Sequence, residues 1–497
     1  MSRFVVALDQ GTTSSRAVLV NKQGKIVGVA QSPFAQHFPK PGWVEHDPKE
    51  ILASQLKVLT ELLVEQGITV DDLDSIGITN QRETAVVWDK RTGEPVHNAI
   101  VWQCRRTADL VERVCAGDGV AKRISEITGL IPDAYYSASK IAWILENVPG
   151  ARERAQAGDL LFGTVDTWLI WNLTQGKVHA TDPTNASRTM LFDIVRGEWS
   201  PWLCDLFGVP QSMLPEVRPS SGDFGLVNHP VIKGNVPICG VAGDQQSALF
   251  GQCCFDAGNA KATFGTGCFL LMNTGGKPCF SRAGLACTVA ASAPGAGRLE
   301  YALEGSVFMA GALMQWLRDG LGILDDVADS ESLATSVEDS AGVYVVPAFT
   351  GLGAPYWDAN ARGAIYGLTR GATKAHLVRA CLEAQAYQVN DVLCAMQKDS
   401  GITVNPLNVD GGACRNDFIC QSCADILDTT IVRPSNVEST AMGSAYLAGL
   451  STGFWRSVDE IKAMRHIDRV FEPDMDYFAR KEAIDGWKQA VERTKSR

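Results

Sequence analysis

The sequence predicts an α/β protein built from two domains that face each other across a cleft. The chain has 497 residues, which is more than one hydrophobic core usually supports. Strand-like and helix-like segments are mixed in both halves, and a hairpin with a hydroxyl-rich turn at residues 9–16 is followed by a similar one at residues 260–273. We interpret this recurrence as a diverged structural duplication, with one domain over residues 1–250 and the other over residues 251–497.

The first half is predicted to open with an antiparallel meander of three short strands. Apolar runs rich in β-branched residues indicate the strands, and polar turns that contain glycine separate them. After the meander, Pro48 begins a helix in which leucine and isoleucine recur at helical spacing as far as Glu65. The same patterns predict strands at residues 4–8, 17–20, 26–30, 76–79, 84–88 and 100–102, further helices at residues 107–115 and 139–147, and buried segments at residues 166–171 and 238–242.

The second half repeats the combination of a hairpin followed by helices. Helical periodicity of the apolar residues distinguishes its helices from the shorter strand-like runs. The presence of both kinds of segment in both halves is the reason for predicting two α/β domains. Strands are predicted at residues 260–264, 269–273 and 408–410, and helices at residues 308–319, 374–397 and 417–427.

The composition excludes several classes of protein. Hydrophobic residues make up 45% and charged residues 20% of the chain, a balance that is typical of globular proteins and not of disordered or fibrous ones. The net charge of −11 argues against nucleic acid or an anionic membrane as the main partner. No apolar run approaches the length of a membrane span, and the N-terminal segment reaches Asp9 too early for a signal peptide. We therefore expect a cytoplasmic protein whose 14 cysteines are reduced.

A turn rich in hydroxyl groups connects the first two predicted strands, with the sequence Asp9-Gln10-Gly11-Thr12-Thr13-Ser14. Gly11 permits a tight turn, and the N–H groups of such a turn, together with the Thr and Ser hydroxyls, form a donor site for phosphate oxygens. Asp9 would place a carboxylate beside that phosphate, which implies a Mg²⁺ ion between them. Taken by itself, the segment is equally compatible with a polar hairpin in which Asp9 forms the turn.

Two further glycine-containing turns make the phosphate interpretation more specific. Residues 263–267, Thr-Phe-Gly-Thr-Gly, place a threonine between glycines in the second hairpin, and Gly411-Gly412 follows a predicted strand. The pair of glycines would allow adenine or its ribose to approach the backbone closely. Neither a P-loop nor a Rossmann motif is present, and the protein kinase motifs are missing as well. A nucleotide would therefore be bound between two facing hairpins.

At these turns the chain resembles the FGGY carbohydrate kinases, which belong to the actin, Hsp70 and sugar kinase superfold. The resemblance implies two ribonuclease H-like (actin-like ATPase) domains. It covers nearly the whole chain and is loose only after about residue 465. Further segments that resemble the family are KPGWVEHDP at residues 40–48, GITNQRET at 77–84, WQCRRT at 102–107, GDQQ at 243–246 and GAPYWD at 353–358.

Within the family the match is closest to members that phosphorylate glycerol, so the resemblance implies ATP-dependent formation of sn-glycerol 3-phosphate. Glycerol offers three hydroxyl groups, and a selective pocket needs both hydrogen-bond donors and acceptors beside apolar walls. By position, the resemblance assigns the general base to Asp244. The residues that match the family's glycerol contacts are Arg82, Glu83, Trp102, Tyr135, Asp244, Gln245 and Phe269.

The resemblance also implies a site for Mg-ATP, with Asp9 holding the Mg²⁺ ion. Closure of the two domains on the ligands would exclude water. Family members are often dimers or tetramers, so we expect a homo-oligomer. The residues that match the family's nucleotide contacts are Thr12, Thr13, Ser14, Arg16, Thr266, Gly267, Gly311, Gln315, Gly412 and Asn416.

Two other functions remain open on the sequence. One is an FGGY kinase that acts on a pentulose or another polyol. The other is a non-catalytic ATP switch or assembly protein of the actin or Hsp70 type. The pair Asp244-Gln245 beside a set of hydroxyl-binding residues favours an enzyme, because a switch does not need such a set.

Overall fold

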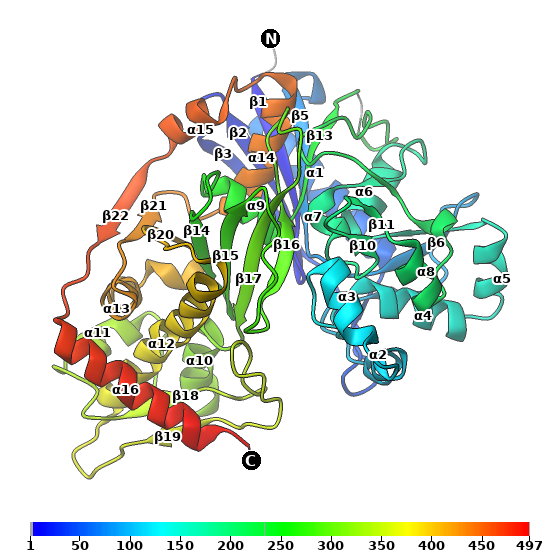
Figure 1. The fold of residues 1–497 in the computed structure, drawn as a ribbon. Helices are drawn as coiled ribbons and strands as arrows, with labels where there is room; N and C mark the ends of the chain where they lie inside the picture. The colour runs from blue at the N-terminus through cyan, green and yellow to red at the C-terminus, as the bar shows by residue number, and fades with distance from the viewer. Residues whose placement is uncertain (1–2, 233, 497) are drawn as a thin grey trace.

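The chain folds around two β-sheets, one in each half (Figure 1). The structure is a computed structural model that describes residues 3–232 and 234–496. In the first sheet, β1, β2 and β3 form the predicted antiparallel meander, and β5 and β13 extend it in parallel with β1. Its strands, in spatial order, are β13 (Ile238–Gly243), β5 (Leu73–Asn80), β1 (Phe4–Gln10), β2 (Ser14–Asn21) and β3 (Ile26–Pro33).

The second sheet repeats this topology. The hairpin of β14 and β15 is continued by antiparallel β17, while β20 pairs in parallel with β14 and β21 in parallel with β20. The prediction of two α/β domains is therefore confirmed. In spatial order the strands are β16 (Ala286–Ala290), β17 (Glu300–Val307), β15 (Cys268–Gly275), β14 (Ala260–Phe264), β20 (Leu407–Asp410), β21 (Ile431–Pro434) and β22 (Ile467–Phe471).

Helices cover both faces of the first sheet. Alternate residues of β1 point to opposite faces, as the pleat requires. Val6 and Leu8 are buried in the cluster that includes α1 (Pro48–Gln66) and α6 (Val165–Leu173). Val5 and Ala7 are buried instead against α14 (Ser439–Thr452). A helix from the C-terminal part of the chain thus completes the core of the first half.

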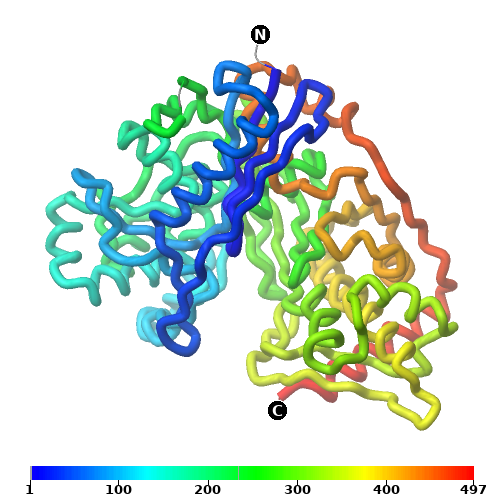
Figure 2. Tube along the Cα trace, turned by 180° about the vertical axis from the view of Figure 1, so that it is seen from behind, coloured from blue at the N-terminus to red at the C-terminus, as the bar shows by residue number. Residues whose placement is uncertain are grey.

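Helix α9 (Asp244–Gly251) lies between α14 and the second sheet, so the two halves share a central helical layer. The other face of the second sheet is covered by α12 (Lys374–Ser400) and α13 (Asp417–Leu427). Figure 1 shows the two lobes joined at the top of the molecule, around α14, and diverging below. Seen from behind, the chain after α14 runs down the outer edge of the second half to the C-terminal helix (Figure 2).

Glycines permit the close contacts at this junction. A Cβ atom on Gly443 of α14 would lie 1.8 Å from the carbonyl oxygen of Ser247 in α9, and one on Gly77 of β5 would lie 2.1 Å from that of Ser444. Real Cβ atoms do not approach backbone oxygens so closely, so any side chain there would force the elements apart. The junction depends on backbone-to-backbone packing at these positions.

Some predicted elements differ in extent from the observed ones. The helix predicted from residue 308 begins at Gly311, and three residues separate it from the end of β17, a strand that was not predicted. The strand predicted at residues 84–88 begins at Val86, since the chain kinks at Glu83, and the one predicted at residues 100–102 is the pair Ala99–Ile100.

Within the described ranges, no helix combines the length and hydrophobicity that crossing a membrane takes.

The remaining elements frame the outer parts of both lobes. These elements are β4 (Glu45–His46), β6 (Val86–Asp89), β7 (Ala99–Ile100), α2 (Ala108–Cys115), α3 (Val120–Thr128), α4 (Ser137–Asn147), α5 (Ala151–Gln156), β8 (Leu160–Gly163), β9 (Ala180–Thr181), α7 (Pro183–Ala186), β10 (Phe192–Asp193), β11 (Glu198–Trp199), α8 (Pro201–Phe207), β12 (Glu216–Val217), α10 (Gly311–Gln315), α11 (Asp329–Thr335), β18 (Tyr344–Val346), β19 (Ala364–Tyr366), α15 (Val458–Met464) and α16 (Tyr477–Thr494).

Candidate active site

Three neighbouring parallel strands of the first sheet bring the predicted metal ligand, substrate-binding arginine and general base to one edge. Asp9 lies near the end of β1, Arg82 follows β5, and Asp244 begins α9 directly after β13. Because these strands are parallel, their carboxyl ends lie side by side. Arg82 Nε is 3.1 Å from Asp244 Oδ1, so the two groups form an ion pair. The strand order therefore accounts for the meeting of residues that are far apart in the sequence.

The first hydroxyl-rich turn lies beside the predicted substrate wall. The N–H of Gly11 donates to the carbonyl of Ser14 at 3.0 Å, which closes the turn. The indole N–H of Trp102 donates to the Thr12 hydroxyl at 3.0 Å. Arg16, predicted to add charge near the phosphates, is ion-paired with Glu438, which precedes α14. The turn thus contacts both the polyol wall and the junction of the halves.

The second hairpin turn is held by the start of α10. The N–H groups of Gly311 and Ala312 donate to the carbonyls of Gly265 and Thr266, each at 3.0 Å. Gly411 adopts a positive φ of 87°, and a Cβ atom there would lie 2.4 Å from the Phe264 carbonyl oxygen. The glycine turn after β20 therefore lies against the end of β14.

The other predicted nucleotide residues lie around this point. A Cβ atom on Gly412 would meet no atom within 4 Å, which leaves open space above its backbone. The Asn416 side chain accepts a hydrogen bond from the Ile419 N–H at 3.1 Å and so caps α13. Gln315 is exposed at the end of α10.

Aromatic side chains stand beside Arg82 and Glu83, as the predicted polyol site requires. The rings of Trp102 and Tyr135 meet edge to face with 5.5 Å between centroids. Tyr136 packs behind Tyr135 and is buried. Of the two neighbouring tyrosines, Tyr135 is therefore the one whose ring contacts Trp102.

Glu83 adopts a left-handed backbone conformation, with φ of 59°. This conformation costs a non-glycine residue about 1–2 kcal/mol. The hydroxyl of Ser137 donates to the Glu83 carbonyl at 2.8 Å and helps to hold the kink. The kink directs the carboxylate of Glu83 to the same buried region as Arg82. Strain at this position is consistent with a functional constraint.

Two residues that the sequence analysis missed complete a buried ion network, Glu304 on β17 and Arg188 after α7. Arg82 forms a two-pronged pair with Glu304, in which Nη2 is 2.9 Å from Oε1. Arg188 Nε donates to Glu83 at 2.6 Å and its Nη2 to Glu304 at 3.1 Å. We call Arg82, Glu83, Arg188 and Glu304 the ion quartet; each side chain is 3% exposed or less.

Lys261 of β14 is a third residue that sequence reasoning missed. Its ammonium group donates to Gln245 Oε1 at 2.5 Å, to Thr263 Oγ1 at 2.8 Å and to the Phe269 carbonyl at 3.3 Å. Gln245 belongs to the first half, whereas Thr263 and Phe269 belong to the second hairpin. Lys261 therefore links two predicted substrate residues across the junction. Nothing in the sequence around Lys261 marks it as a site residue, since a single lysine in a strand is usually exposed.

The electrostatics of the site suit a base beside a cation. Burial raises the pKa of Asp244, an effect that Arg82 opposes and Glu304 reinforces. Burial raises the pKa of Asp9 to about 7, and the neighbouring Asp244 and Glu438 carboxylates add to the shift while Arg16 opposes it. Repulsion between the Asp9 and Asp244 carboxylates would be relieved by a divalent cation, and carboxylate oxygens are ligands that Mg²⁺ prefers. Asp9 thus fits the predicted role.

Lys140 orients the loop that carries Tyr135. Its buried ammonium group donates to three successive carbonyls, of Ala134, of Tyr135 at 2.7 Å and of Tyr136 at 3.1 Å. Burial lowers the pKa of this lysine to about 7. Three hydrogen bonds from one group fix the backbone on both sides of the Tyr135 ring.

We predict that Lys140→Met raises the KM for the polyol about tenfold and leaves kcat within about threefold, because Tyr135 loses its fixed position but no reacting group is removed. Steady-state kinetics with the substrate varied at saturating ATP provide the measurement. Lys122→Met is the matched control, because Lys122 is 81% exposed on α3. An unchanged KM in the folded Lys140 variant would contradict the prediction.

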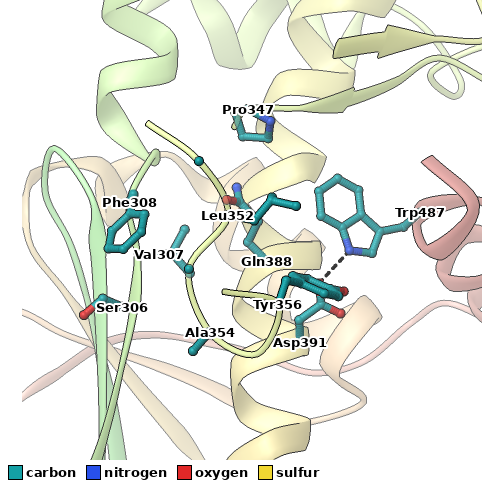
Figure 3. A pocket seen from close by; sticks show the side chains of 12 residues that line it. Ser306, Val307, Phe308, Pro347, Leu352, Ala354, Tyr356, Gln388, Asp391 and Trp487 are labelled. Atoms are coloured by element: carbon teal, nitrogen blue, oxygen red, sulfur yellow. Dashed lines mark hydrogen bonds between the residues drawn. The ribbon is translucent and has the colours of Figure 1, made fainter. Parts of the chain in front are cut away.

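A separate pocket lies in the second half, between the loop at residues 351–356, α12 and α16 (Figure 3). At its base the Asp391 carboxylate accepts hydrogen bonds from the Trp487 indole N–H at 2.7 Å and the Tyr356 hydroxyl at 2.8 Å. Burial raises the pKa of Asp391 to about 6. None of the predicted substrate or nucleotide residues lines this pocket.

Comparisons with known proteins agree with this geometry. Residues 4–251 match the N-terminal domain, and residues 260–452 the C-terminal domain, of the FGGY family of carbohydrate kinases. A protein of Fusobacterium nucleatum called glycerol kinase is 57% identical over 494 residues, which are 99% of either chain. A Bacillus anthracis protein of the same name is 55% identical over 497 residues, the full length of both chains.

Solved structures show the same fold. The crystal structure of Plasmodium falciparum glycerol kinase with ADP superposes with a TM-score of 0.94 at 38% identity, and covers 100% of this chain and 99% of that one. A ligand-bound xylulose kinase from Lactobacillus acidophilus has a TM-score of 0.88 at 22% identity over 99% of this chain and 97% of that one. At 22% identity, the match to the xylulose kinase shows a shared fold and nothing more.

Proposed function

The chain belongs to the FGGY family of carbohydrate kinases, and we propose on that premise that it transfers the γ-phosphoryl group of ATP to glycerol, giving sn-glycerol 3-phosphate and ADP. Relatives of the same length with 55–57% identity are called glycerol kinase. The observation that carries the proposal is the convergence of Arg82, Glu83 and Asp244 beside the Trp102–Tyr135 pair. Donor, acceptors and apolar walls within one small site suit a neutral triol.

In this proposal Asp244 is the general base. It accepts the proton of a primary hydroxyl of glycerol as that oxygen attacks the γ-phosphorus in line with the departing ADP. Arg82 and Glu83 hold the remaining hydroxyls, while Gln245 and Tyr135 can donate or accept. Trp102 and Phe269 cover the carbon backbone. Most of the rate enhancement of such a transfer comes from positioning and charge neutralisation rather than covalent chemistry.

The nucleotide would lie between the two hairpin turns. Thr12, Thr13 and Ser14 on one side, and Thr266 with Gly267 on the other, would donate to phosphate oxygens. Asp9 would hold Mg²⁺, which when bound neutralises charge on the transferred phosphoryl group and on ADP. Gly311, Gln315, Gly412 and Asn416 would bound the adenosine part, and Arg16 would add positive charge near the phosphates. A cytoplasmic location and a homo-oligomeric state stay predictions.

A substrate panel tests the proposal. ADP release coupled to NADH oxidation would be measured with glycerol, other polyols, pentuloses and gluconate, each with Mg-ATP. We expect kcat/KM for glycerol to exceed that for every other compound by at least about tenfold, since unmatched polar groups in the site penalise a wrong polyol. Higher efficiency with a pentulose would indicate another kinase of the family. ATP turnover that no alcohol stimulates would indicate a switch protein.

The acid limb of the pH–rate profile is expected to lie above the range of an ordinary aspartate. Burial raises the pKa of Asp244 and Arg82 opposes it, and a base must be deprotonated to act, so kcat/KM falls as the pH drops through this raised value. An exposed aspartate would titrate only near about pH 4. The profile between about pH 4 and pH 9 provides the measurement. Full activity down to pH 4 would contradict this assignment.

A further inference from the structure

The ion quartet joins the two halves and includes two of the proposed glycerol-binding residues, Arg82 and Glu83. Arg82 and Glu83 follow β5 of the first sheet, and Arg188 follows α7, which also belongs to the first half. Glu304 is the member that comes from the second sheet, in the middle of β17. Every connection between Glu304 and the quartet therefore crosses the junction of the halves.

Glu304 fixes both polyol-binding groups. Its two carboxylate oxygens pair with the guanidinium of Arg82, which holds that group in one plane. It also accepts from Arg188, whose Nε in turn holds Glu83 at 2.6 Å. Arg188 is itself placed by a reciprocal amide pair between Asn80, at the end of β5, and Asn185 of α7.

Glu304 also competes with Asp244 for Arg82. Arg82 Nε lies 3.1 Å from Asp244, while both terminal nitrogens are directed to Glu304. If Glu304 lost its charge, the guanidinium would be free to turn fully to Asp244, the next nearest carboxylate. A base that is paired in this way with a guanidinium is a weaker acceptor of the substrate proton. The carboxylate on β17 thus keeps the base available.

We propose that Glu304 is a positioning residue for the transfer: it acts through Arg82 and Arg188 to assemble the glycerol site only when the second sheet is docked on the first. The inference rests on the proposed function, because it concerns the same substrate and the same base. Under this proposal, the docking of the second sheet on the first is coupled to the formation of the polyol site. Glu304 itself need not touch the substrate.

Glu304→Gln tests the proposal, because the amide keeps the size of the side chain and removes its charge. We expect the KM for glycerol to rise about 10²-fold and kcat to fall about tenfold, with the KM for ATP within about threefold of the wild type. Glu300→Gln is the matched control, since Glu300 lies four residues earlier on the same face of β17 and outside the quartet. It should leave all three constants within about twofold.

A pH profile separates positioning from loss of structure. The charged groups facing Asp244 are Arg82, Glu304, Lys261 and Asp9. Loss of the negative charge at Glu304 should lower the pKa of Asp244, so the acid limb of kcat/KM should move to lower pH. A change that merely loosened the fold would not move it. An unmoved limb together with a wild-type KM for glycerol would overturn the proposal.

Arg188→Lys is the second variant, in case Glu304→Gln does not fold. Lysine keeps the positive charge but lacks the guanidinium group, whose nitrogens bridge Glu304 and Glu83. The KM for glycerol should therefore rise about tenfold, with a smaller change in kcat. A KM like that of the wild type would overturn the proposal. The wild-type enzyme, assayed alongside, tests the proposed function separately, and the variants are compared with it on the polyol that it turns over best.

Discussion

Asp244→Asn is expected to lower kcat by about 10²–10⁴-fold, because the amide cannot accept the proton of the attacking hydroxyl. The dissociation constants of glycerol and ATP should change by no more than several-fold, since Asn keeps the size of the side chain and an oxygen that faces Arg82 at the position where Asp244 lies 3.1 Å away. Steady-state kinetics give kcat, and isothermal calorimetry gives the two binding constants.

Asp391→Asn is the matched control for this substitution. Asp391 is also a partly buried aspartate with a raised pKa, but its partners are Tyr356 and Trp487 in the separate pocket (Figure 3). Its kcat should remain within about threefold of the wild type. If Asp244→Asn kept a kcat as high as this control, Asp244 would not be the base.

Gly443→Ala is expected to destabilise the protein by about 3 kcal/mol or more, because the new methyl group would clash with the backbone of α9. The built Cβ atom lies 1.8 Å from the Ser247 carbonyl oxygen, and a backbone atom cannot rotate away as a side-chain end can. Because α9 begins with Asp244, activity should also fall at temperatures below the melting point. The midpoint of thermal unfolding and the activity at 25 °C are the measurements.

Gly371→Ala provides the comparison for the glycine substitution. Its nearest neighbour to a built Cβ atom is a threonine hydroxyl at 3.7 Å, an ordinary contact, and the residue is exposed. Its melting temperature should equal that of the wild type within about one degree. Equal stability of the Gly443 and Gly371 variants would mean that the helices α9 and α14 can separate at little cost.

Local patterns were sufficient to predict the parts of the fold that depend on neighbours in the sequence. The meander at the N-terminus, the long helix after Pro48 and the hairpin at residues 260–273 each have their own periodicity and turn residues, and all three are present. Strand β17 was not predicted because its residues mix alanine, glycine and two glutamates, which leaves no clear alternation. The same strand carries Glu304.

The residues of the site also divide into those that the sequence could predict and those that it could not. Asp9 lies near the end of a strand, and Arg82 and Asp244 follow strands, so the rule that parallel strands end at one edge brings them together before any contact is known. Glu304 and Arg188 lie 222 and 106 positions from Arg82, and nothing near them in the sequence marks them as its partners. A buried ion becomes recognisable only when the packing of both sheets is known.

Local sequence patterns also could not predict where α14 packs. Its residues are almost uniformly apolar or small, which indicates a buried helix without showing which sheet it covers. The structure places it on the first sheet, against Val5 and Ala7. The predicted division at residue 250 remains a prediction, while the two sheets and the shared layer of α9 and α14 describe the core.

A crystal structure of the protein with glycerol and a nonhydrolysable ATP analogue would test most directly whether both halves grip the nucleotide while Asp244 faces the alcohol. We expect a primary hydroxyl of glycerol within hydrogen-bond distance of the Asp244 carboxylate and directed at the γ-phosphorus, with the phosphates between the turns at residues 11–14 and 265–267. Glycerol bound away from Asp244, or a γ-phosphate out of reach of its hydroxyl, would contradict the proposed chemistry.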